Sequence, residues 1–250
     1  MGKTNTEKVI ARLLERLQME RVGNIRNGIY RGIQIHFAYN SNRIEGSRLS
    51  EEQIQFIFDT NTIGFEEEQA LSIDDIIETK NHFRAVDYVL DTVSSPLTEA
   101  WIKQVHVILK SGTSQADKDW FVVGDYKKFP NEVGDRLTTP PDEVASAIAT
   151  LLNEYSKRSN KTVEDIIDFH VAFEHIHPFQ DGNGRVGRLV MFKELLCNKL
   201  FPFIITDDKK YFYYRGLKEW DNEKNFLCET CFSCQDDFIA YLNYYKIDEE

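Results

Sequence analysis

The densest chemical signal in this 250-residue chain is the stretch His177-Pro-Phe-Gln-Asp-Gly-Asn-Gly-Arg-Val-Gly-Arg188. It places a histidine, an aspartate, an asparagine, glycines and two arginines within twelve positions. Any one of these residues alone would suit a tight turn followed by a solvated helix. The combination favours a site for an anionic ligand.

The glycines and arginines of this stretch suit phosphate. Gly182 and Gly184 allow the backbone to turn sharply, so that successive N–H groups converge on an anion at the positive end of the following helix. Arg185 and Arg188 lie three residues apart on one helix face, and both can reach phosphate oxygens. We therefore expect a phosphate cradle at the start of this helix.

A carboxylate and an imidazole lie close to the cradle in the sequence. Asp181 is a lone carboxylate of the kind that holds Mg²⁺ together with nucleotide oxygens and water. His177 has a reference pKa of about 6.5, which suits a general base near neutral pH.

Two other interpretations of the same region are weaker. The spacing from Gly182 to Gly187 matches G-x-G-x-x-G, with Asp207 about 20 residues further on, which is the fingerprint of a dinucleotide site. That fingerprint needs a strand before it, whereas residues 163–171 repeat their apolar side chains with helical period.

A metal site is the other alternative, because His170, Glu174, His175 and His177 are close in sequence. Histidines at i and i+5 share a helix face poorly, and Pro178 disfavours helical geometry at His177. We interpret His170, which lies on the apolar face, as a core histidine with a hydrogen-bond partner.

Cys228, Cys231 and Cys234 form C-x-x-C-x-x-C, and Cys197 is the fourth cysteine. Zinc or iron–sulfur binding is an open alternative, although structural sites usually bring four ligands in two pairs. A spacing of three also stacks small apolar side chains on one helix face, and we favour that interpretation.

Helical periodicity dominates the chain, from a capped amphipathic segment at residues 10–17 onward. A short apolar cluster at 54–58 is followed by expected helices at 73–93, 101–109, 144–152, 163–174, 184–198, 208–220 and 227–245. Pro96, Pro140 and Pro141 are expected in first helical turns, where a missing N–H costs nothing. Strand signals are confined to 120–139, where we expect a small hairpin flap. The sequence therefore predicts an all-α fold with a small β-hairpin flap and an N-terminal helical extension.

The composition limits the class of partner. Lys and Arg total 30 against 41 Asp and Glu, a net charge of −11, which argues against general attraction to nucleic acid or anionic lipid. No apolar run approaches the roughly 18 residues of a membrane helix, and charged residues interrupt the N-terminal apolar run before it could act as a signal peptide. We expect a cytoplasmic protein with no nucleic acid and no membrane as a partner.

The stretch from His177 to Arg188 resembles the signature of Fic (filamentation induced by cAMP) domain proteins, H-P-F-x-[DE]-G-N-G-R-x-x-R, at every fixed position. The resemblance implies an all-helical Fic fold that transfers AMP from ATP to a hydroxyl of a target protein. Two further matches are weaker. Gly124-Asp-Tyr-Lys, with Val133 and Gly134, is similar to the family's flap, which docks the target. Tyr213 and Tyr214, with Asn222, are similar to the family's adenosine-contacting helix, although Asp221 could take the place of Asn222.

The resemblance also implies a role for each motif residue. His177 takes the proton of a Ser, Thr or Tyr hydroxyl, and Asp181 holds Mg²⁺ on the α- and β-phosphates. Arg185 binds the β-phosphate and Arg188 the γ-phosphate. Asn183 and the glycine backbone, at Gly182, Gly184 and Gly187, bind the α- and β-phosphates.

A second family element lies upstream, in Ser41-Asn-Arg-Ile-Glu45-Gly46, which is similar to the inhibitory motif [ST]-x-x-x-E-[GN]. Its position resembles that in the class with an N-terminal inhibitory helix. Glu45 can form a bidentate pair with Arg188, which would remove the arginine from the γ-phosphate and put a negative charge in its place.

We therefore predict an autoinhibited protein adenylyltransferase, with an N-terminal helical region at 1–70 and a Fic core with C-terminal helices at 71–250. Its substrate is ATP, its cofactor is Mg²⁺, and its target is another protein or the chain itself; a homo-oligomer is left open. Two alternatives stay open: removal of AMP from a modified protein, with Glu45 orienting a water, and a silenced binding module.

Overall fold

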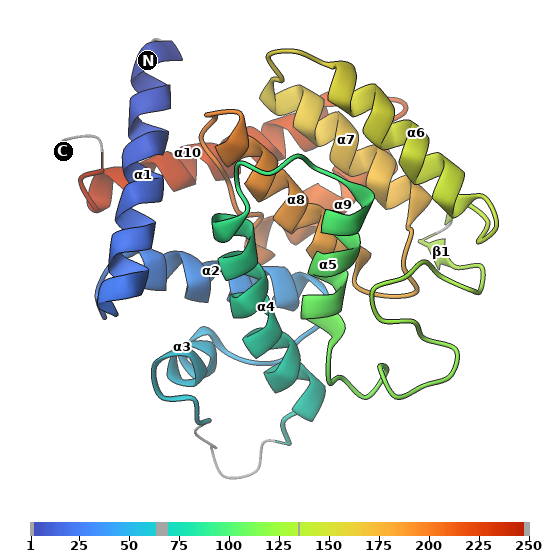
Figure 1. The fold of residues 1–250 in the computed structure, drawn as a ribbon, viewed down its shortest axis with the longest axis horizontal. Coiled ribbons are helices and arrows are strands. Elements are labelled where there is room, and N and C mark those ends of the chain that lie inside the picture. The colour runs from blue at the N-terminus through green and yellow to red at the C-terminus, as the bar shows by residue number, and fades with distance from the viewer. Residues whose placement is uncertain (1–2, 64–69, 135, 248–250) are drawn as a thin grey trace.

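A computed structural model describes residues 3–63, 70–134 and 136–247. Helices dominate these residues, and their β structure consists of one two-stranded antiparallel sheet (Figure 1). The fold is thus all-α with a small hairpin, as expected. In chain order, the elements are α1 (Lys3–Gly23), α2 (Ile29–Ile44), α3 (Glu51–Thr60), α4 (Ile73–Asp91), α5 (Glu99–Lys110), β1 (Glu132–Val133), β2 (Arg136–Leu137), α6 (Val144–Lys157), α7 (Val163–Ile176), α8 (Asn183–Cys197), a 3₁₀ turn η1 (Asp207–Lys209), α9 (Lys210–Lys218) and α10 (Asn225–Tyr244).

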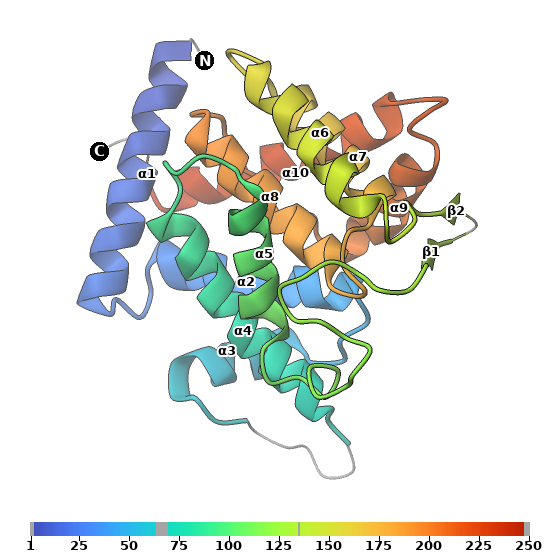
Figure 2. The ribbon, with the colours of Figure 1, turned by 45° about the vertical axis from the view of Figure 1, so that its right-hand side comes forward.

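Helix α8 lies at the centre of the molecule, with α7, α5, α4 and α2 packed around it (Figures 1 and 2). From Asn183 to Leu196, Gly184 is the one residue that is not buried. A helix that is buried all round needs neighbours on every side. Because α8 begins within the motif, this packing holds the expected phosphate cradle against the core.

The three prolines lie before the helices that follow them, rather than in their first turns. The Thr98 hydroxyl accepts a hydrogen bond from the Trp101 N–H at the start of α5, so Pro96 lies before the cap. Pro140 and Pro141 likewise precede α6, which begins at Val144. The expectation that these prolines occupy first helical turns is therefore wrong. At α5 the Thr98 hydroxyl caps the helix, whereas α6 begins without a side-chain cap.

Helices α1 and α2 share one hydrophobic core with the rest of the chain. Val9 of α1 and Ile33 of α2 belong to the same cluster of buried side chains as Phe192 of α8. The expected boundary at residue 70 stays a prediction, and residues 64–69, which precede it, lie outside the described part of the chain.

The hairpin forms where the strand signals predicted it. Glu132 pairs with Leu137 and Val133 with Arg136, in antiparallel register. Figure 2 shows the two strands at the edge of the molecule, on the side where α9 lies.

The cysteines of the C-x-x-C-x-x-C stretch pack into the core. Cys228, Cys231 and Cys234 are all buried on α10 and belong to the main cluster of apolar side chains. Within residues 3–63, 70–134 and 136–247, no group of three or more His, Cys, Asp or Glu could hold a metal ion.

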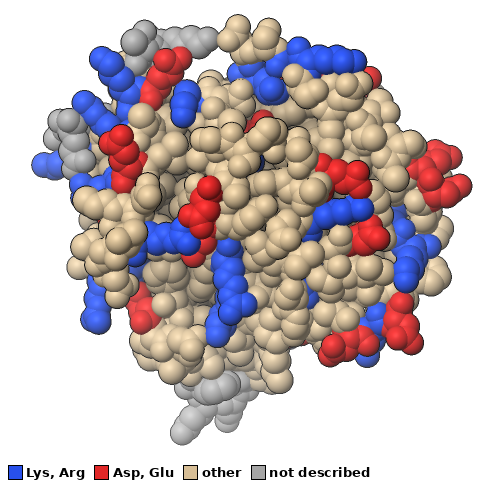
Figure 3. Space-filling model, viewed as in Figure 1, with Lys and Arg blue, Asp and Glu red and all other residues tan. Residues whose placement is uncertain are grey.

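The surface mixes charges of both signs. Lys and Arg are interspersed with Asp and Glu over the face drawn in Figure 3. In the part of the chain that the structure describes, no helix combines the length and apolar character needed to cross a membrane.

Candidate active site

The loop between α7 and α8 carries the motif, and its conformation follows from its sequence. α7 ends because His177 adopts the left-handed conformation, with φ of 51°, while its N–H still bonds to the carbonyl of Phe173. Pro178 disfavours helical geometry at the residue before it. The imidazole of His177 is therefore held at a fixed point, where one helix ends.

Asn183 and His106 hold this loop closed. The Asn183 amide accepts a hydrogen bond from the Phe179 N–H at 2.8 Å and donates one to the Phe179 carbonyl at 2.9 Å. The His106 ring of α5 stacks on the Phe179 ring, with 3.9 Å between centroids. Its Nδ1 accepts from the Gly124 N–H at 2.9 Å, so its Nε2 donates to the Asp181 carbonyl at 3.1 Å. Since the loop uses both ends of the Asn183 amide, a phosphate contact by this side chain stays a prediction.

The start of α8 has the geometry of an anion site. Gly182 caps the helix with φ of 84°, a conformation that glycine adopts without steric cost. The first N–H groups of any α-helix lack helical partners and carry its positive end. The helix that precedes the glycines excludes the dinucleotide interpretation, which requires a strand there.

Four charged side chains form a network beside this helix start. Glu78 of α4 makes ion pairs with Lys110 of α5 and with Arg185. The Lys110 Nζ lies 2.7 Å from Asp181 Oδ2, and the Arg185 Nη2 lies 3.6 Å from the same oxygen. Burial disfavours the charge of Asp181, but Arg185 and Lys110 outweigh it and lower the pKa of this carboxyl. Asp181 is therefore an anion at neutral pH.

Arg188 is held by the end of α2. Its Nη2 donates to Glu45 Oε1 at 2.7 Å and to the Ser41 carbonyl at 2.9 Å, and its Nε donates to Ser41 Oγ at 3.0 Å. Burial disfavours both charges, but Glu45 raises the pKa of Arg188, while Arg188 and Arg185 lower that of Glu45. Gly46 follows with φ of 102°, a conformation in which other residues are strained.

A cavity of about 630 Å³ brings together much of the expected site. The expected site residues on its wall are His177, Gly184, Arg188, Glu45, Val133, Gly134, Tyr213 and Tyr214. The others are not among the residues that line it: Ser41, Gly46, Asp181, Gly182, Asn183, Arg185, Gly187 and Asn222.

The hairpin is tied to this cavity from two sides. Lys127, which is buried, donates from Nζ to Asn131 Oδ1 at 2.7 Å and to the Ile176 carbonyl at 3.3 Å. Burial lowers the pKa of Lys127 to about 8. Arg136 of β2 lies 3.0 Å from His175 Nε2 and donates to Asp221 Oδ2 at 3.1 Å. The hairpin is thus anchored both at the motif and beyond α9.

Helix α9 contributes two tyrosines to the cavity wall. The Tyr213 hydroxyl lies 2.7 Å from His170 Nε2, which confirms His170 as a core histidine with a hydrogen-bond partner. The Tyr214 hydroxyl donates to the Ile44 carbonyl at 3.2 Å, next to Glu45. Asn222 is exposed and donates to Glu219 Oε2. Adenosine contacts by these residues stay a prediction.

His177 is a weaker base than its reference pKa of about 6.5 suggested. Burial lowers its pKa to about 4, so the imidazole is neutral at neutral pH. Its Nδ1 lies 3.3 Å from the Glu174 carbonyl, to which it can donate a proton. This tautomer leaves the lone pair of Nε2 free to accept a proton.

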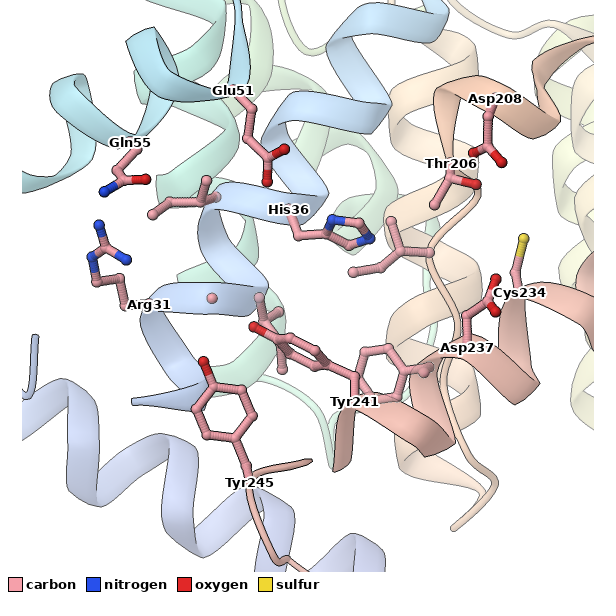
Figure 4. Close-up of a pocket in the computed structure, with 15 residues that line it drawn as sticks. Arg31, His36, Glu51, Gln55, Thr206, Asp208, Cys234, Asp237, Tyr241 and Tyr245 are labelled. Atoms are coloured by element: carbon pink, nitrogen blue, oxygen red, sulfur yellow. The ribbon is translucent and has the colours of Figure 1, made fainter. Parts of the chain in front are cut away.

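A second cavity, of about 450 Å³, lies between α2, α3, η1 and α10 (Figure 4). The ring of His36 has three carboxylates around it, from Glu51, Asp208 and Asp237. Burial lowers the pKa of His36, and these carboxylates oppose the shift. None of the residues that line this cavity belongs to the expected site, so the larger cavity is the candidate active site.

Sequence reasoning missed several residues that organise the site. His106 and Lys110 lie four apart on α5, on the face that buries Val105 and Leu109. A histidine and a lysine on an apolar helix face are a usable signal, because buried charges require partners. Glu78 gave no such signal, since its partners come from α5 and α8.

These features describe a mostly helical protein with a glycine-capped start to a buried helix and a histidine near it. Residues 96–195 match the model of the Fic/DOC family. Over these residues the chain is similar to Fic-domain proteins.

Solved structures share its fold. A Fic domain containing signaling protein from Bacteroides thetaiotaomicron VPI-5482 matches with a TM-score of 0.73 and 22% identity, over 98% of this chain and 97% of that one. A Fic family protein from Desulfovibrio desulfuricans G20 matches with a TM-score of 0.70 and 23% identity, over 97% of this chain and 74% of that one.

Curated relatives are similar over part of their length. A probable protein adenylyltransferase of Aquifex aeolicus (strain VF5) is 41% identical over 75 residues, which are 29% of this chain and 23% of that protein. The protein adenylyltransferase Fic of Drosophila mojavensis is 24% identical over 189 residues, 72% of this chain and 35% of that protein. The matches thus span well under half of these relatives.

Proposed function

We propose that this chain is an autoinhibited protein adenylyltransferase, which transfers AMP from ATP to a hydroxyl of a target protein. The observation that carries the proposal is the convergence of His177, Gly184, Arg188 and Glu45 on one cavity, which the hairpin also lines. The names of the curated relatives support the activity, and the ion pair between Glu45 and Arg188 supports the inhibition.

Catalysis rests on position and charge. The hydroxyl oxygen of the target forms a bond to the α-phosphorus, the bond to the β-phosphate oxygen breaks, and pyrophosphate leaves. His177 accepts the hydroxyl proton at Nε2. Arg185, held by Glu78, and the start of α8 neutralise the phosphates, a role that grows as charge develops on the leaving group.

Asp181 is the residue that would hold Mg²⁺. Its carboxyl stays ionised and its side chain is 38% exposed, so the donor suits an ion whose other ligands are phosphate oxygens and water. When bound, magnesium supplies charge neutralisation on the phosphates. Lys110 holds one oxygen of Asp181 and would orient this carboxylate for that role.

Inhibition follows from the contacts of Arg188. Glu45 and Ser41 together accept hydrogen bonds from its Nε and Nη2, and its Nη1 is buried without a hydrogen-bond partner among the described residues. With Glu45 docked, the Arg188 guanidinium cannot turn fully towards a γ-phosphate. The Glu45 carboxylate also repels that phosphate. ATP then binds in an unproductive position.

The test compares wild type, Glu45→Gly, Glu45→Gln and Glu45→Gly/Arg188→Ala with labelled ATP and Mg²⁺, with and without cell lysate. Releasing a hydrogen bond to a charged group is worth about 1.5–3 kcal/mol, so both single variants should label themselves or a target at least about tenfold faster than wild type. The double variant should return to low labelling, since the gain depends on Arg188.

The matched control is Glu52→Gln, which removes an exposed carboxylate from α3. It should label at the wild-type rate. Equal labelling by wild type and both Glu45 variants, with ATP in excess, would overturn the inhibitory role of Glu45. If no variant transfers AMP and a pre-modified target loses its AMP, the chain removes AMP from proteins instead of adding it.

A further inference from the structure

Glu174 is a buried carboxyl in the wall of the same cavity, and the mechanism above does not use it. It lies in the last turn of α7, three residues before His177. Its Oε2 is 3.7 Å from His177 Nδ1, and its side chain is 10% exposed. Its Oε1 is buried and has no hydrogen-bond partner among the described residues. A polar group in such a position requires an explanation.

Two glycines of α8 locate Glu174 relative to the inhibitory carboxylate. A Cβ atom at Gly184 would lie 2.3 Å from Glu45 Oε1, and one at Gly187 would lie 2.8 Å from Glu174 Oε1. Positions three apart are neighbours on one helix face, about 5–6 Å apart at Cβ. The carboxyls of Glu45 and Glu174 therefore lie over the same face of α8, roughly one turn apart.

Two carboxylates this close in a buried site cannot both be ionised cheaply. Glu45 is the charged one of the two, because Arg188 Nη2 donates a hydrogen bond to its Oε1 at 2.7 Å. Burial raises the pKa of Glu174 to about 8, and the charge of Glu45 adds to the increase. With Glu45 docked, Glu174 is therefore a neutral carboxylic acid at neutral pH.

Of the described groups around Glu174, only Glu45 carries a negative charge that disfavours ionisation of Glu174. The titratable and charged side chains that face it come from four elements or their ends: Glu45 just past α2, Arg188 of α8, Tyr213 and Tyr214 of α9, His170 of α7 and His177 just past α7. Both tyrosines have pKa values raised by burial, and burial lowers the pKa of His170 to about 3, so all three are neutral at pH 7. Glu45, whose pKa is lowered, is therefore the one anion in this group.

We propose that Glu174 is a positioning residue for His177 and that docked Glu45 keeps it neutral. This inference rests on the proposed function, in which His177 takes the hydroxyl proton. Once Glu45 withdraws, Glu174 ionises beside His177 Nδ1 and stabilises the imidazolium that forms when Nε2 accepts the proton. Glu45 thus inhibits in two ways: it holds Arg188, and it keeps Glu174, the partner of His177, protonated.

The experiment measures the pKa of His177 in the full chain without ATP or target, so it does not depend on whether the protein transfers AMP. Histidine is labelled with ¹³C at Cε1, and the His177 resonance is identified by its loss in His177→Ala. Because burial lowers the pKa of His177 to about 4, the titration runs from pH 8 to pH 3. The proteins are wild type, Glu174→Gln, Glu45→Gly and Glu45→Gly/Glu174→Gln.

Glu174→Gln should leave the pKa of His177 unchanged when Glu45 is present, because an amide replaces a neutral acid of the same shape. In the Glu45→Gly background, Glu174→Gln should lower the pKa of His177 by about one unit or more, since it removes a carboxylate within about 4–6 Å. The same change in both backgrounds, including no change in either, would overturn the proposal. The control Glu164→Gln, an exposed carboxylate on α7, should have no effect in either background.

A second measurement does not depend on how Glu174→Gln folds. Glutamate labelled with ¹³C at Cδ reports whether each carboxyl is protonated. Wild type should retain one protonated glutamate at pH 7, and Glu45→Gly should lose that signal. Its persistence in Glu45→Gly, or its absence from wild type, would contradict the control of Glu174 by Glu45.

Discussion

At the scale of single residues, the site depends on buried groups whose charge is set by their neighbours. His177 is neutral because burial lowers its pKa to about 4, whereas Asp181 stays ionised because Arg185 and Lys110 outweigh its burial. A neutral base and an anionic metal ligand four residues apart are what the proposed transfer requires. Each role can be tested by one substitution.

We expect His177→Ala, in the Glu45→Gly background, to lower the rate of AMP transfer by about 10²–10⁴, because it removes the proton acceptor. Binding of ATP should be retained, since the start of α8 is unchanged. Initial rates with labelled ATP and an equilibrium binding assay measure the two effects. His36→Gln, in the second cavity, is the control and should leave the rate unchanged. A His177→Ala rate above about a tenth of the parent rate would exclude His177 as the base.

At the scale of elements, α2 connects the proposed inhibition to the fold. Its last turns carry Ser41 and end beside Glu45, and its carbonyl at Ile44 accepts a hydrogen bond from Tyr214 of α9. The N–H of Asp207 donates to Asn40 Oδ1 at 2.8 Å, which adds η1 to the contacts of the same helix. Residues 31–33, 35 and 36 of α2 line the second cavity, whereas Glu45, just past the C-terminal end of α2, lines the candidate active site.

We expect Ser41→Ala to activate transfer less than Glu45→Gly does. The variant removes the hydrogen bond from Arg188 Nε to Ser41 Oγ but keeps the ion pair with Glu45 and the bond to the Ser41 carbonyl. A net loss of about 1 kcal/mol corresponds to roughly fivefold faster labelling.

Ser47→Ala is the matched control for this comparison. Ser47 is a buried serine near the same helix end, and its hydroxyl accepts from the Leu49 N–H rather than from Arg188. Labelling should stay at the wild-type rate in this variant. Activation by Ser47→Ala equal to that by Ser41→Ala would indicate general loosening of the segment instead of release of Arg188.

At the scale of the whole molecule, the fold buries several neutral histidines. Burial lowers the pKa of His82 and His170 to about 3, and that of His106 and His177 to about 4. In the unfolded chain each has a pKa of about 6.5. Below that pH the unfolded state binds protons that the folded state does not accept.

We therefore expect the free energy of unfolding to fall as the pH decreases from about 6.5 towards 4. Each of the four histidines contributes up to about 1.4 kcal/mol per pH unit. Glu174 acts in the opposite sense, because its pKa of about 8 lets the folded state hold a proton, but it is one group against four. Urea unfolding at several pH values between 7.5 and 5 measures the slope. If the free energy of unfolding stays constant or rises as the pH is lowered from 7.5 to 5, the four histidines are not buried as neutral groups.

Much of the local structure was predictable because it depends on residues close in sequence. Pro178 disfavours a helix at His177, and the observed end of α7 agrees with that prediction. Apolar periodicity located most helices to within a few residues, because side chains three and four apart share a face. The position of Pro96 was misjudged, since the capping hydroxyl of Thr98 competes with proline for the helix start. Pro140 was also misjudged, because α6 begins only at Val144 and without a side-chain cap.

The order of the motif residues, the turn at its glycines and the helix after it are local properties, and the sequence alone predicted them. Only the tertiary structure decided the contact between Glu45 and Arg188, which are 143 residues apart, and the network of Glu78 and Lys110 around Asp181. Such contacts depend on how α2, α4 and α5 pack around α8. Spacing along the chain carries little information about that packing, because buried charges find their partners across helices rather than along them.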